Sequence, residues 1–339
     1  MRELTLFIPG MLNLARDMVD RDIPSVPALE HLFACGRYER LLNKGFSETL
    51  CMLFGIDTGN EQDLPVAAIT HAVDDQSSAG IWMRADPVHL TVDTEGIALM
   101  DASTFTLDQH DALVLAAEIK ELLAESGYTL QAPTTKRWYL KLDKKPNIRT
   151  TAIHEVVGQN IHQYMPTGDD ESDWRLLMNE IQMCLHASQI NEERQQRGEL
   201  PVNSIWFWGS GALPETLECQ WSRVFSDEEI ARGLAKHANV PCAELPECID
   251  EILEQAGKAD NMLAVISFGL RHAQYHDLGG WQDFISYLEQ YWFARLSSYI
   301  KIGELGKLVI LTENQKITIT KLSFCKIWKR RKSISKYFG

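Results

Sequence analysis

The segment 179–211 gathers amide and guanidinium side chains ahead of an apolar strand and a glycine-rich turn. Asn191, Arg194 and Asn203 precede the mainly apolar residues 204–208, which lead into Gly209-Ser210-Gly211. In open α/β sheets, ligands bind beyond the carboxyl ends of the strands, and the N–H groups of a glycine turn can approach an anion closely. We therefore interpret the segment as a candidate anion-binding site. The alternative is a tight turn after a buried strand, because a Gly-x-Gly pattern alone is a weak signal.

Two other groups of residues are of types that can bind ligands. Arg84 and Asp86 are two residues apart, which suits either a phosphate-binding guanidinium or a structural ion pair. His272 and His276 are four residues apart, so a helix would place both imidazoles on one face, where they could bind a metal. Asp277 follows directly, and it suits either a metal ligand or the cap of the next helix.

The elements that must position these residues begin with an α/β pattern. Residues 4–8 form a short apolar run stopped by Pro9-Gly10, which is typical of a buried strand. Residues 27–36 open with proline and close with glycine, and this asymmetry predicts a helix. Residues 66–70 are apolar and predict a second strand.

The middle of the chain has a different pattern. Residues 81–102 alternate apolar and polar side chains around a central turn, so they predict a hairpin. Residues 106–126 and 174–186 carry apolar stripes at helical spacing, and residues 138–142 predict a strand. A hairpin, a strand and two helices indicate an α+β unit.

After residue 204 the alternation of strands and helices returns. We expect strands at 204–208, 262–268 and 307–312 and helices at 226–236, 247–256 and 281–296. The last strand has the Val, Ile and Leu content of a parallel sheet that is covered on both faces. The sequence therefore predicts a doubly wound α/β core made of residues 1–84 and 205–339, with an α+β domain inserted at residues 85–204.

Composition limits the classes of partner. The 339 residues carry a net charge of −14, yet the segment from Lys321 onward has seven basic residues and no acidic one. An acidic body repels nucleic acid. The basic run 329–332 is either a solvated surface segment or a contact for an anionic partner or for the chain's own acidic surface.

The chain also lacks the patterns of membrane and secreted proteins. No stretch has the roughly 18 uncharged apolar residues of a membrane span, and the first nine residues do not resemble a signal peptide. We therefore expect a cytoplasmic protein without a membrane span. The seven cysteines are scattered and form no CxxC pair, so we expect free thiols rather than disulfides or a zinc site.

Several segments together resemble a known family. Residues 186–203 and 208–214 resemble the Asn…Arg…Gly…Pro-x-Asn…Gly-x-Gly…Pro signature of the archaeal-type cofactor-independent phosphoglycerate mutases, and residues 84–101 resemble the start of their inserted domain. The likeness extends across most of the chain. Among bacterial proteins the chain is similar to the RpfE-type regulatory proteins. The resemblance implies an alkaline-phosphatase-like core with an inserted domain.

The family's chemistry uses two divalent metals and a serine that is transiently phosphorylated, because paired metals neutralise phosphate charge and hold the attacking and leaving oxygens. By the resemblance, Ser47 stands at the position of the nucleophile. Pro9 stands where the family has a metal-binding aspartate, and its side chain cannot coordinate a metal.

The remaining ligand positions agree only in part. His276 and Asp277 match the family's later His-Asp pair, but His272 replaces an aspartate. Glu313 and Asn314 stand in place of an Asp-His pair, and the family's last histidine has no counterpart near residue 324. Ser47 on its own is also of the type that caps a helix or forms a turn.

Our first hypothesis is therefore a noncatalytic, phosphoglycerate-mutase-like protein that binds or regulates. It would need no cofactor, and its partner would be a phosphorylated small molecule or another protein. In this hypothesis an anion pocket is lined by residues of the strand entry and of the signature segment, namely Arg84, Asp86, Asn191, Arg194, Asn203, Gly209 and Gly211.

Two alternatives stay open. One is an active phosphomutase or phosphohydrolase that uses Mn or Mg, with Ser47 as nucleophile and with four metal ligands, His272, His276, Asp277 and Glu313, since Glu can replace Asp as a hard oxygen donor. The other is an interaction module whose surface uses some of the nine tryptophans. Burial in the core is the commoner use of such side chains.

Overall fold

The computed structural model describes residues 2–13, 23–56, 59, 63–75, 79–93, 96–257, 260–325 and 331–338. The chain divides into two compact units, of which the first combines Met1–Phe54 with Glu218–Gly339 and the second is Gly55–Leu217. The first unit thus draws on both parts of the chain, as the predicted core does. Residues 55–84 and 205–217 lie in the second unit, whereas the sequence prediction placed them in the core.

The sheet of the second unit explains this boundary. Strand β3 (Ile81–Asp93) runs without a break across the predicted border at residue 84. It pairs with β7 (Ser204–Gly211) from Trp82 to Val88. Because the two strands share this ladder, they belong to one hydrogen-bonded unit.

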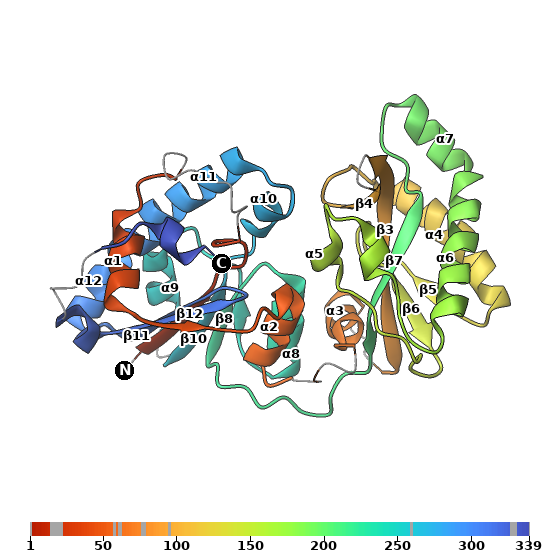
Figure 1. Ribbon diagram of the computed structural model, residues 1–339. Coiled ribbons are helices and arrows are strands. Elements are labelled where there is room, and N and C mark those ends of the chain that lie inside the picture. The colour runs from red at the N-terminus through yellow and green to blue at the C-terminus, as the bar shows by residue number, and fades with distance from the viewer. Residues whose placement is uncertain are drawn as a thin grey trace. The chain divides into compact units, whose positions relative to one another are not determined.

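The first unit is built on a seven-stranded sheet in the order β2-β12-β11-β1-β10-β8-β9. Figure 1 labels β12, β11, β10 and β8 of this sheet. The five strands from β11 to β9 are parallel to their neighbours, whereas β12 pairs antiparallel with both β11 and β2. The strands are β1 (Arg2–Phe7), β2 (Arg37–Arg40), β8 (Arg223–Phe225), β9 (Cys242–Ala243), β10 (Asn261–Val265), β11 (Leu305–Leu311) and β12 (Gln315–Thr320). The parallel core with crossover helices confirms the predicted α/β class.

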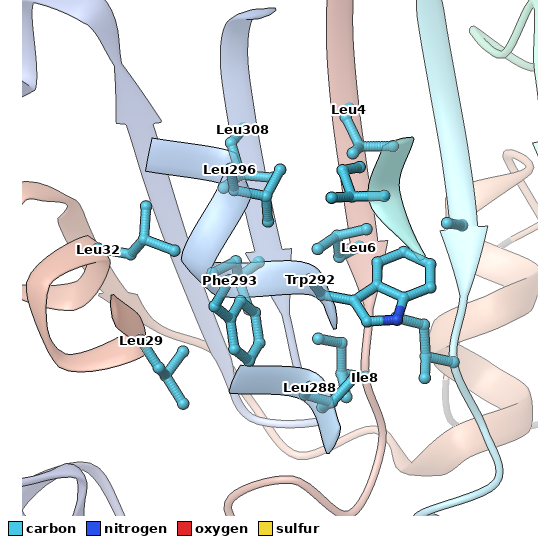
Figure 2. Close-up of a cluster of buried hydrophobic side chains, with 14 of the residues drawn as sticks. Leu4, Leu6, Ile8, Leu29, Leu32, Leu288, Trp292, Phe293, Leu296 and Leu308 are labelled. Carbon is cyan, nitrogen blue, oxygen red and sulfur yellow. The ribbon is translucent and has the colours of Figure 1, made fainter. Parts of the chain in front are cut away.

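One face of this sheet carries the main hydrophobic core. Leu4 and Leu6 of β1 and Leu308 of β11 point to the same side, where they meet helix residues such as Trp292 and Phe293 (Figure 2). All five side chains are fully buried. Consecutive residues of a strand point to opposite faces, so their neighbours Thr5, Lys307 and Val309 are on the other face of the sheet.

Helices cover both faces of the sheet. Residues of α1, α9, α11 and α12 belong to the hydrophobic core of which Figure 2 shows a part. On the opposite face of the sheet, Phe46 of α2 stacks on Phe7 of β1, with the ring centroids 5.8 Å apart. The helices of this unit are α1 (Pro27–Cys35), α2 (Gly45–Leu53), α8 (Glu229–His237), α9 (Ile249–Gln255), α10 (Leu270–Gln274), α11 (Leu278–Leu288) and α12 (Ala294–Ile302), with 3-10 turns η4 (Lys321–Cys325) and η5 (Ile334–Tyr337). The predicted helix at 281–296 is interrupted by a π-helical turn, η3 (Glu289–Phe293).

The second unit has a five-stranded, antiparallel sheet in the order β4-β3-β6-β5, with β7 paired to β3. Besides β3 and β7, the strands are β4 (Gly96–Asp101), β5 (Thr129–Gln131) and β6 (Tyr139–Leu142). The helices are α3 (Val66–Asp74), α4 (Gln109–Glu125), α5 (Ile153–Val156), α6 (Glu171–His186) and α7 (Gln189–Gln196), with a 3-10 turn η2 (Ile161–Tyr164). The predicted α+β character is confirmed.

Strand β7 lies between two layers of side chains, and all of its residues are buried. Phe207 packs edge-on against Trp174 of α6, and Trp208 contacts His154 of α5 in the same way. Adjacent residues of one strand point to opposite faces, so α5 and α6 pack on different faces. This double burial explains the apolar run in the sequence.

Residues 66–70 and 209–211 have a different local structure from the one predicted. Residues 66–70 form the first turns of helix α3 rather than a strand, because a short apolar run has the same composition in a buried helix as in a buried strand. Gly209-Ser210-Gly211 forms the end of β7 rather than a turn after it. The ladder resumes at Gly211, which pairs with Trp82, after a register shift at Gly209, where φ is 68°.

Among the described residues, no helix is long and apolar enough to cross a membrane. The six cysteines other than Cys325 are free thiols, as predicted for them.

Candidate functional site

Arg84 and Asp86 form a buried ion pair on β3. The Arg84 Nε lies 2.9 Å from Asp86 Oδ1 and the Arg84 Nη2 lies 2.8 Å from Asp86 Oδ2, so the contact is bidentate. Each side chain is 3% exposed. Residues two apart on a strand share a face, which brings the two charges together without any turn.

The surroundings of this pair complete its hydrogen bonds. Asp86 also accepts bonds from the Trp208 indole at 2.8 Å and from the Trp138 backbone N–H at 3.3 Å. The Arg84 Nη1 donates to Thr70 Oγ1 at 3.3 Å, and the guanidinium carbon lies 4.9 Å from the centroid of the Trp208 ring. Of the two interpretations made from the sequence, this geometry is that of the structural ion pair.

Arg194 of α7 is likewise held by internal partners, and its side chain is fully buried. Its guanidinium bonds Asp111 at 2.9 Å and the carbonyl oxygens of Leu200 and Thr106. A planar guanidinium with acceptors on several sides is fixed in place and neutralised. Arg194 therefore joins α7, the start of α4 and the loop before β7.

The two predicted asparagines bond backbone groups. Asn191 donates to the carbonyls of Leu185 and Val202 and accepts from the Val202 N–H at 2.9 Å. Asn203 accepts from the Leu90 N–H at 2.7 Å and donates to the Leu90 carbonyl at 2.8 Å. Their amides satisfy buried backbone groups where strand pairing is absent.

The segment Gly209-Ser210-Gly211 binds a carboxyl group of the chain itself, that of Asp63. Asp63 Oδ2 accepts hydrogen bonds from the Ser210 N–H at 3.3 Å and from Ser210 Oγ at 3.2 Å. Thr150 supplies two more donors to Asp63, and its Oγ1 also accepts from the Gly209 N–H at 3.1 Å. Burial raises the pKa of Asp63, and these hydrogen bonds oppose that rise. A Cβ on Gly211 would lie 2.8 Å from Pro65 Cβ, so the glycine allows close packing.

The predicted anion-binding residues do not surround one pocket. Arg84 is six residues from Leu90, the partner of Asn203, along the same strand, which corresponds to about 20 Å at about 3.3 Å per residue. The signature residues therefore act at separate places in the second unit.

In the first unit, Ser47 lies within the first turn of α2 and is 1% exposed. Its neighbour Phe46 stacks on Phe7 of β1 and anchors this turn against the sheet. Lys44 occupies the N-cap position without a side-chain capping hydrogen bond, so Ser47 is not the N-cap residue.

His272 and Asp277 form a hydrogen-bonded pair at the start of α11. The His272 Nδ1 lies 2.7 Å from Asp277 Oδ2, and Asp277 Oδ1 accepts the Gly280 N–H at 3.0 Å. The Gly280 hydrogen bond and the His272 hydrogen bond lower the pKa of Asp277. Asp277 is therefore the helix cap, which was one of its two interpretations from the sequence.

The expectation that His272 and His276 share a helix face is wrong. Helix α10 ends at Gln274, and His276 has a left-handed backbone with φ of 53°. The chain reverses its curvature there, so the regular i, i+4 spacing of a helix does not hold.

Glu313 follows β11 and is 4% exposed. Its Oε1 accepts the Gly10 N–H at 2.9 Å, whereas Oε2 is buried without a hydrogen-bond partner among the described residues. Burial raises the pKa of Glu313. The structure thus brings together the ends of β1 and β11, two strand ends that the resemblance assigned to metal binding.

The structure does not gather the proposed metal ligands. Among the residues described, no three or more His, Cys, Asp or Glu side chains are grouped closely enough to hold a metal ion. His272, His276, Asp277 and Glu313 therefore do not form one ligand set in this structure. Asp277 caps α11 through the Gly280 N–H, and Glu313 accepts a hydrogen bond from the Gly10 N–H.

A cavity of about 480 Å³ that was not predicted from the sequence lies in the first unit, and we call it the sheet-face cavity. It lies on the sheet face opposite the core of Figure 2, since its walls include Lys307, Val309, Lys316 and Thr318, which alternate with core residues of β11 and β12. Glu313 also lines it. The signal was the alternation of Lys and Thr with Ile and Leu, which marks a sheet face that is not part of the apolar core.

Three lysines line the sheet-face cavity, and each is near an acidic side chain. Lys307 is 2.7 Å from Glu3 and Lys44 is 2.9 Å from Glu48. Lys316 is less closely paired, at 3.9 Å from Glu39. Ion pairs that are partly exposed contribute only about 0–1 kcal/mol, so an anionic ligand can compete for these ammonium groups.

The comparisons with known proteins point to one group of enzymes. No family model matches the chain. The chain is 24% identical over 235 residues to a 2,3-bisphosphoglycerate-independent phosphoglycerate mutase of Methanosarcina mazei, which covers 65% of this chain and 58% of that protein. It is 36% identical over 139 residues to a probable enzyme of the same name from Geobacter sulfurreducens, covering 40% and 35%.

The matched region spans about half the length of these curated relatives: the match to the Methanosarcina barkeri enzyme covers 45% of it. A solved protein from Pyrococcus horikoshii aligns with 94% of this chain and 87% of its own at a TM-score of 0.54 and 10% identity, which shows a shared fold. A cofactor-independent phosphoglycerate mutase from Thermoplasma acidophilum aligns at 14% identity and a TM-score of 0.49, covering 100% and 95%. The chain is related to these mutases at low identity.

Proposed function

We propose that this chain is a noncatalytic relative of the phosphoglycerate mutases that binds a small anionic molecule in the sheet-face cavity. The resemblance to RpfE-type regulatory proteins supports a regulatory use of that binding, in the cytoplasm. The loss of catalysis is inferred chiefly from Glu313. Its carboxyl is buried and accepts a hydrogen bond from the backbone of Gly10, beside Pro9.

The chemistry of phosphate transfer explains why Glu313 matters. Paired metals supply several kcal/mol of charge stabilisation, and about 1.4 kcal/mol corresponds to a tenfold change in rate. Mg and Mn need hard oxygen donors that converge on them. Pro9 offers no side-chain oxygen, and Glu313 uses Oε1 to hold Gly10. The positions that carry metals in the family thus stabilise the join between β1 and β11.

The sheet-face cavity has the composition of a site for a small anion with an apolar part. Lys307 and Lys316 supply positive charge, and Thr318 supplies a hydroxyl. Leu53 and Trp221 supply apolar walls. A volume of about 480 Å³ lies in the range of small-molecule pockets, roughly 300–1,000 Å³. The proposed ligand is therefore a phosphorylated or carboxylated small molecule.

Calorimetry on the full chain tests this binding function with phosphorylated three-carbon acids, their unphosphorylated forms and longer carboxylic acids. We expect at least one anion to bind and Lys316→Ala to weaken it about tenfold or more. Lys120→Ala, an exposed lysine of α4 in the second unit, is the matched control and should leave the affinity unchanged. Absence of binding by all probes, or equal binding by Lys316→Ala, would overturn the proposed site.

A separate experiment tests the noncatalytic part of the proposal. Purified chain is assayed for mutase and phosphatase turnover with added Mn or Mg, and bound metal is measured by elemental analysis. We expect no turnover above the rate of the Ser47→Ala variant. Turnover that needs Ser47 would instead establish the active metal-dependent phosphomutase or phosphohydrolase.

A further inference from the structure

A second cavity of about 780 Å³ lies elsewhere in the first unit, where the segment 331–338 meets α1 and β2. We refer to it as the basic cavity. Its described walls carry three cationic side chains, Arg37, Lys332 and Lys336, and two tyrosines, Tyr38 and Tyr337. None of the sheet-face cavity's residues belongs to it.

The wall formed by residues 331–338 is anchored in the protein interior. Ile334 is fully buried and belongs to the main hydrophobic core. Tyr337 packs edge-on against Phe33 of α1 with ring centroids 4.8 Å apart, and its carbonyl accepts a hydrogen bond from Gln315. The anchored segment therefore holds Lys332 and Lys336 at the rim instead of leaving them on a solvated extension.

The charge of the basic cavity is weakly compensated. No acidic side chain is among its described lining residues. Arg37 is 3.3 Å from Glu39, but the two side chains are 82% and 38% exposed, so water screens the pair. Lys332 and Lys336 form no ion pair with the acidic residues that the structure describes. In a chain of net charge −14, this local concentration of positive charge attracts anions.

The aromatic walls narrow the class of anion. Tyr38 is 44% exposed, and its ring centroid lies 5.9 Å from that of Tyr337. Flat rings such as nucleobases stack on tyrosine, at about 1–3 kcal/mol per base. Arg and Lys bind phosphate oxygens through charge-assisted hydrogen bonds. The volume is also within the roughly 300–1,000 Å³ of small-molecule sites.

We propose that the basic cavity binds a nucleotide, with its phosphates on Arg37, Lys332 and Lys336 and its base against Tyr38 and Tyr337. This site does not depend on the sheet-face cavity or on the loss of mutase chemistry. Because the contacts to phosphate are ionic and near the surface, the affinity falls as the salt concentration rises.

Binding to the full chain is measured by calorimetry at low salt with ATP, ADP, GTP, adenosine and inorganic pyrophosphate. We expect the nucleotides to bind more tightly than either adenosine or pyrophosphate. The double variant Lys332→Ala/Lys336→Ala should weaken nucleotide binding about tenfold or more, and Tyr38→Ala should weaken nucleotides but not pyrophosphate. Circular dichroism verifies that these surface variants are folded.

Two further variants locate the site. Lys120→Ala, in the second unit, should leave nucleotide binding unchanged. Lys316→Ala alters the sheet-face cavity and shows whether nucleotides bind there instead. Loss of binding in Lys316→Ala with none in the double variant would overturn the assignment to the basic cavity. Pyrophosphate binding as tightly as nucleotides would overturn the assignment to a nucleotide, and so would the absence of any binding.

Discussion

The two units use charged side chains in opposite ways. In the second unit, Arg84 and Arg194 are almost fully buried, and each has a carboxylate within 2.9 Å. In the first unit, the lysines lie around the rims of two cavities, where Lys307 is 41% exposed and its partner Glu3 is 42% exposed. The same kind of charge thus supports the fold in one unit and remains accessible to ligands in the other.

This difference follows from the cost of burying a charge. A buried ion that lacks a partner costs several kcal/mol, so folding selects internal carboxylates and carbonyls for each buried guanidinium. An exposed ammonium loses little when its partner is exchanged for a ligand. Residue type therefore does not separate the two uses, but burial does.

The largest expected effect is the loss of stability when a buried charge of the second unit is removed, compared with removal of an exposed charge of the first unit. Arg194→Met leaves Asp111 with Arg197 as its partner but leaves the Leu200 and Thr106 carbonyls without the buried guanidinium. It should lower the free energy of unfolding by about 2–4 kcal/mol. Lys316→Ala should change it by about 0.5 kcal/mol or less. Denaturant unfolding measures both values, and hydrogen exchange localises the loss to α7 and α4.

The buried ion pair on β3 tests whether its two charges stabilise the second unit only together. Arg84→Met alone leaves Asp86 as an uncompensated buried charge, whereas Arg84→Met with Asp86→Leu removes both charges. Because paired replacement by apolar residues is often nearly neutral, the double variant should be more stable than the single one. Equal losses in the two variants would mean that the pair is not a closed structural unit.

A smaller effect tests the glycine segment as a packing device. Gly211→Ala places a Cβ 2.8 Å from Pro65 Cβ and should lower the free energy of unfolding by about 1–3 kcal/mol. Gly279→Ala is the matched control, because the nearest atom to its added Cβ is an Asp277 oxygen at 3.8 Å. Thermal unfolding compares the two, and an unchanged Gly211→Ala variant would argue against close packing there.

Glu313 links stability to pH in the first unit. Its pKa in the folded state is raised by burial, so the folded protein holds this proton more tightly than the unfolded chain. Its contribution to stability is complete below the ordinary glutamate pKa and is lost as the pH rises through the raised value. Glu313→Gln should therefore be more stable relative to wild type at neutral than at acidic pH. Denaturant unfolding across this range measures the difference, and parallel curves would contradict it.

The smallest expected effect concerns Asp277, which is exposed. Its pKa is lowered by the Gly280 and His272 hydrogen bonds, so its contribution is present above the ordinary aspartate pKa and is lost as the pH falls. Asp277→Ala should slightly lower the melting temperature at neutral pH, and Asp277→Asn should lower it less, since asparagine also caps helices. A metal-dependent melting temperature that is lost in both variants would instead indicate a ligand role.

Much of the fold follows from local pattern. The strand at residues 4–8, the helix at 27–36 and the hairpin at 81–102 were predicted near their observed positions because periodicity and end signals act over a few residues. The helix at 66–74 was missed, since a short run that is buried on all sides has no period. The sheet-face cavity was not predicted, because the residues that line it come from segments distant in sequence, such as Thr49, Trp221 and Lys316.

Local sequence pattern predicted most of the helices and strands and showed which side chains have the chemistry to bind anions. The partners of those side chains follow from the folded chain. Asp63 reaches Ser210 across 147 residues and Asp111 reaches Arg194 across 83, and no local pattern encodes such pairings. They arise because folding buries these groups together, and a buried charge or N–H group must find a partner where water is excluded.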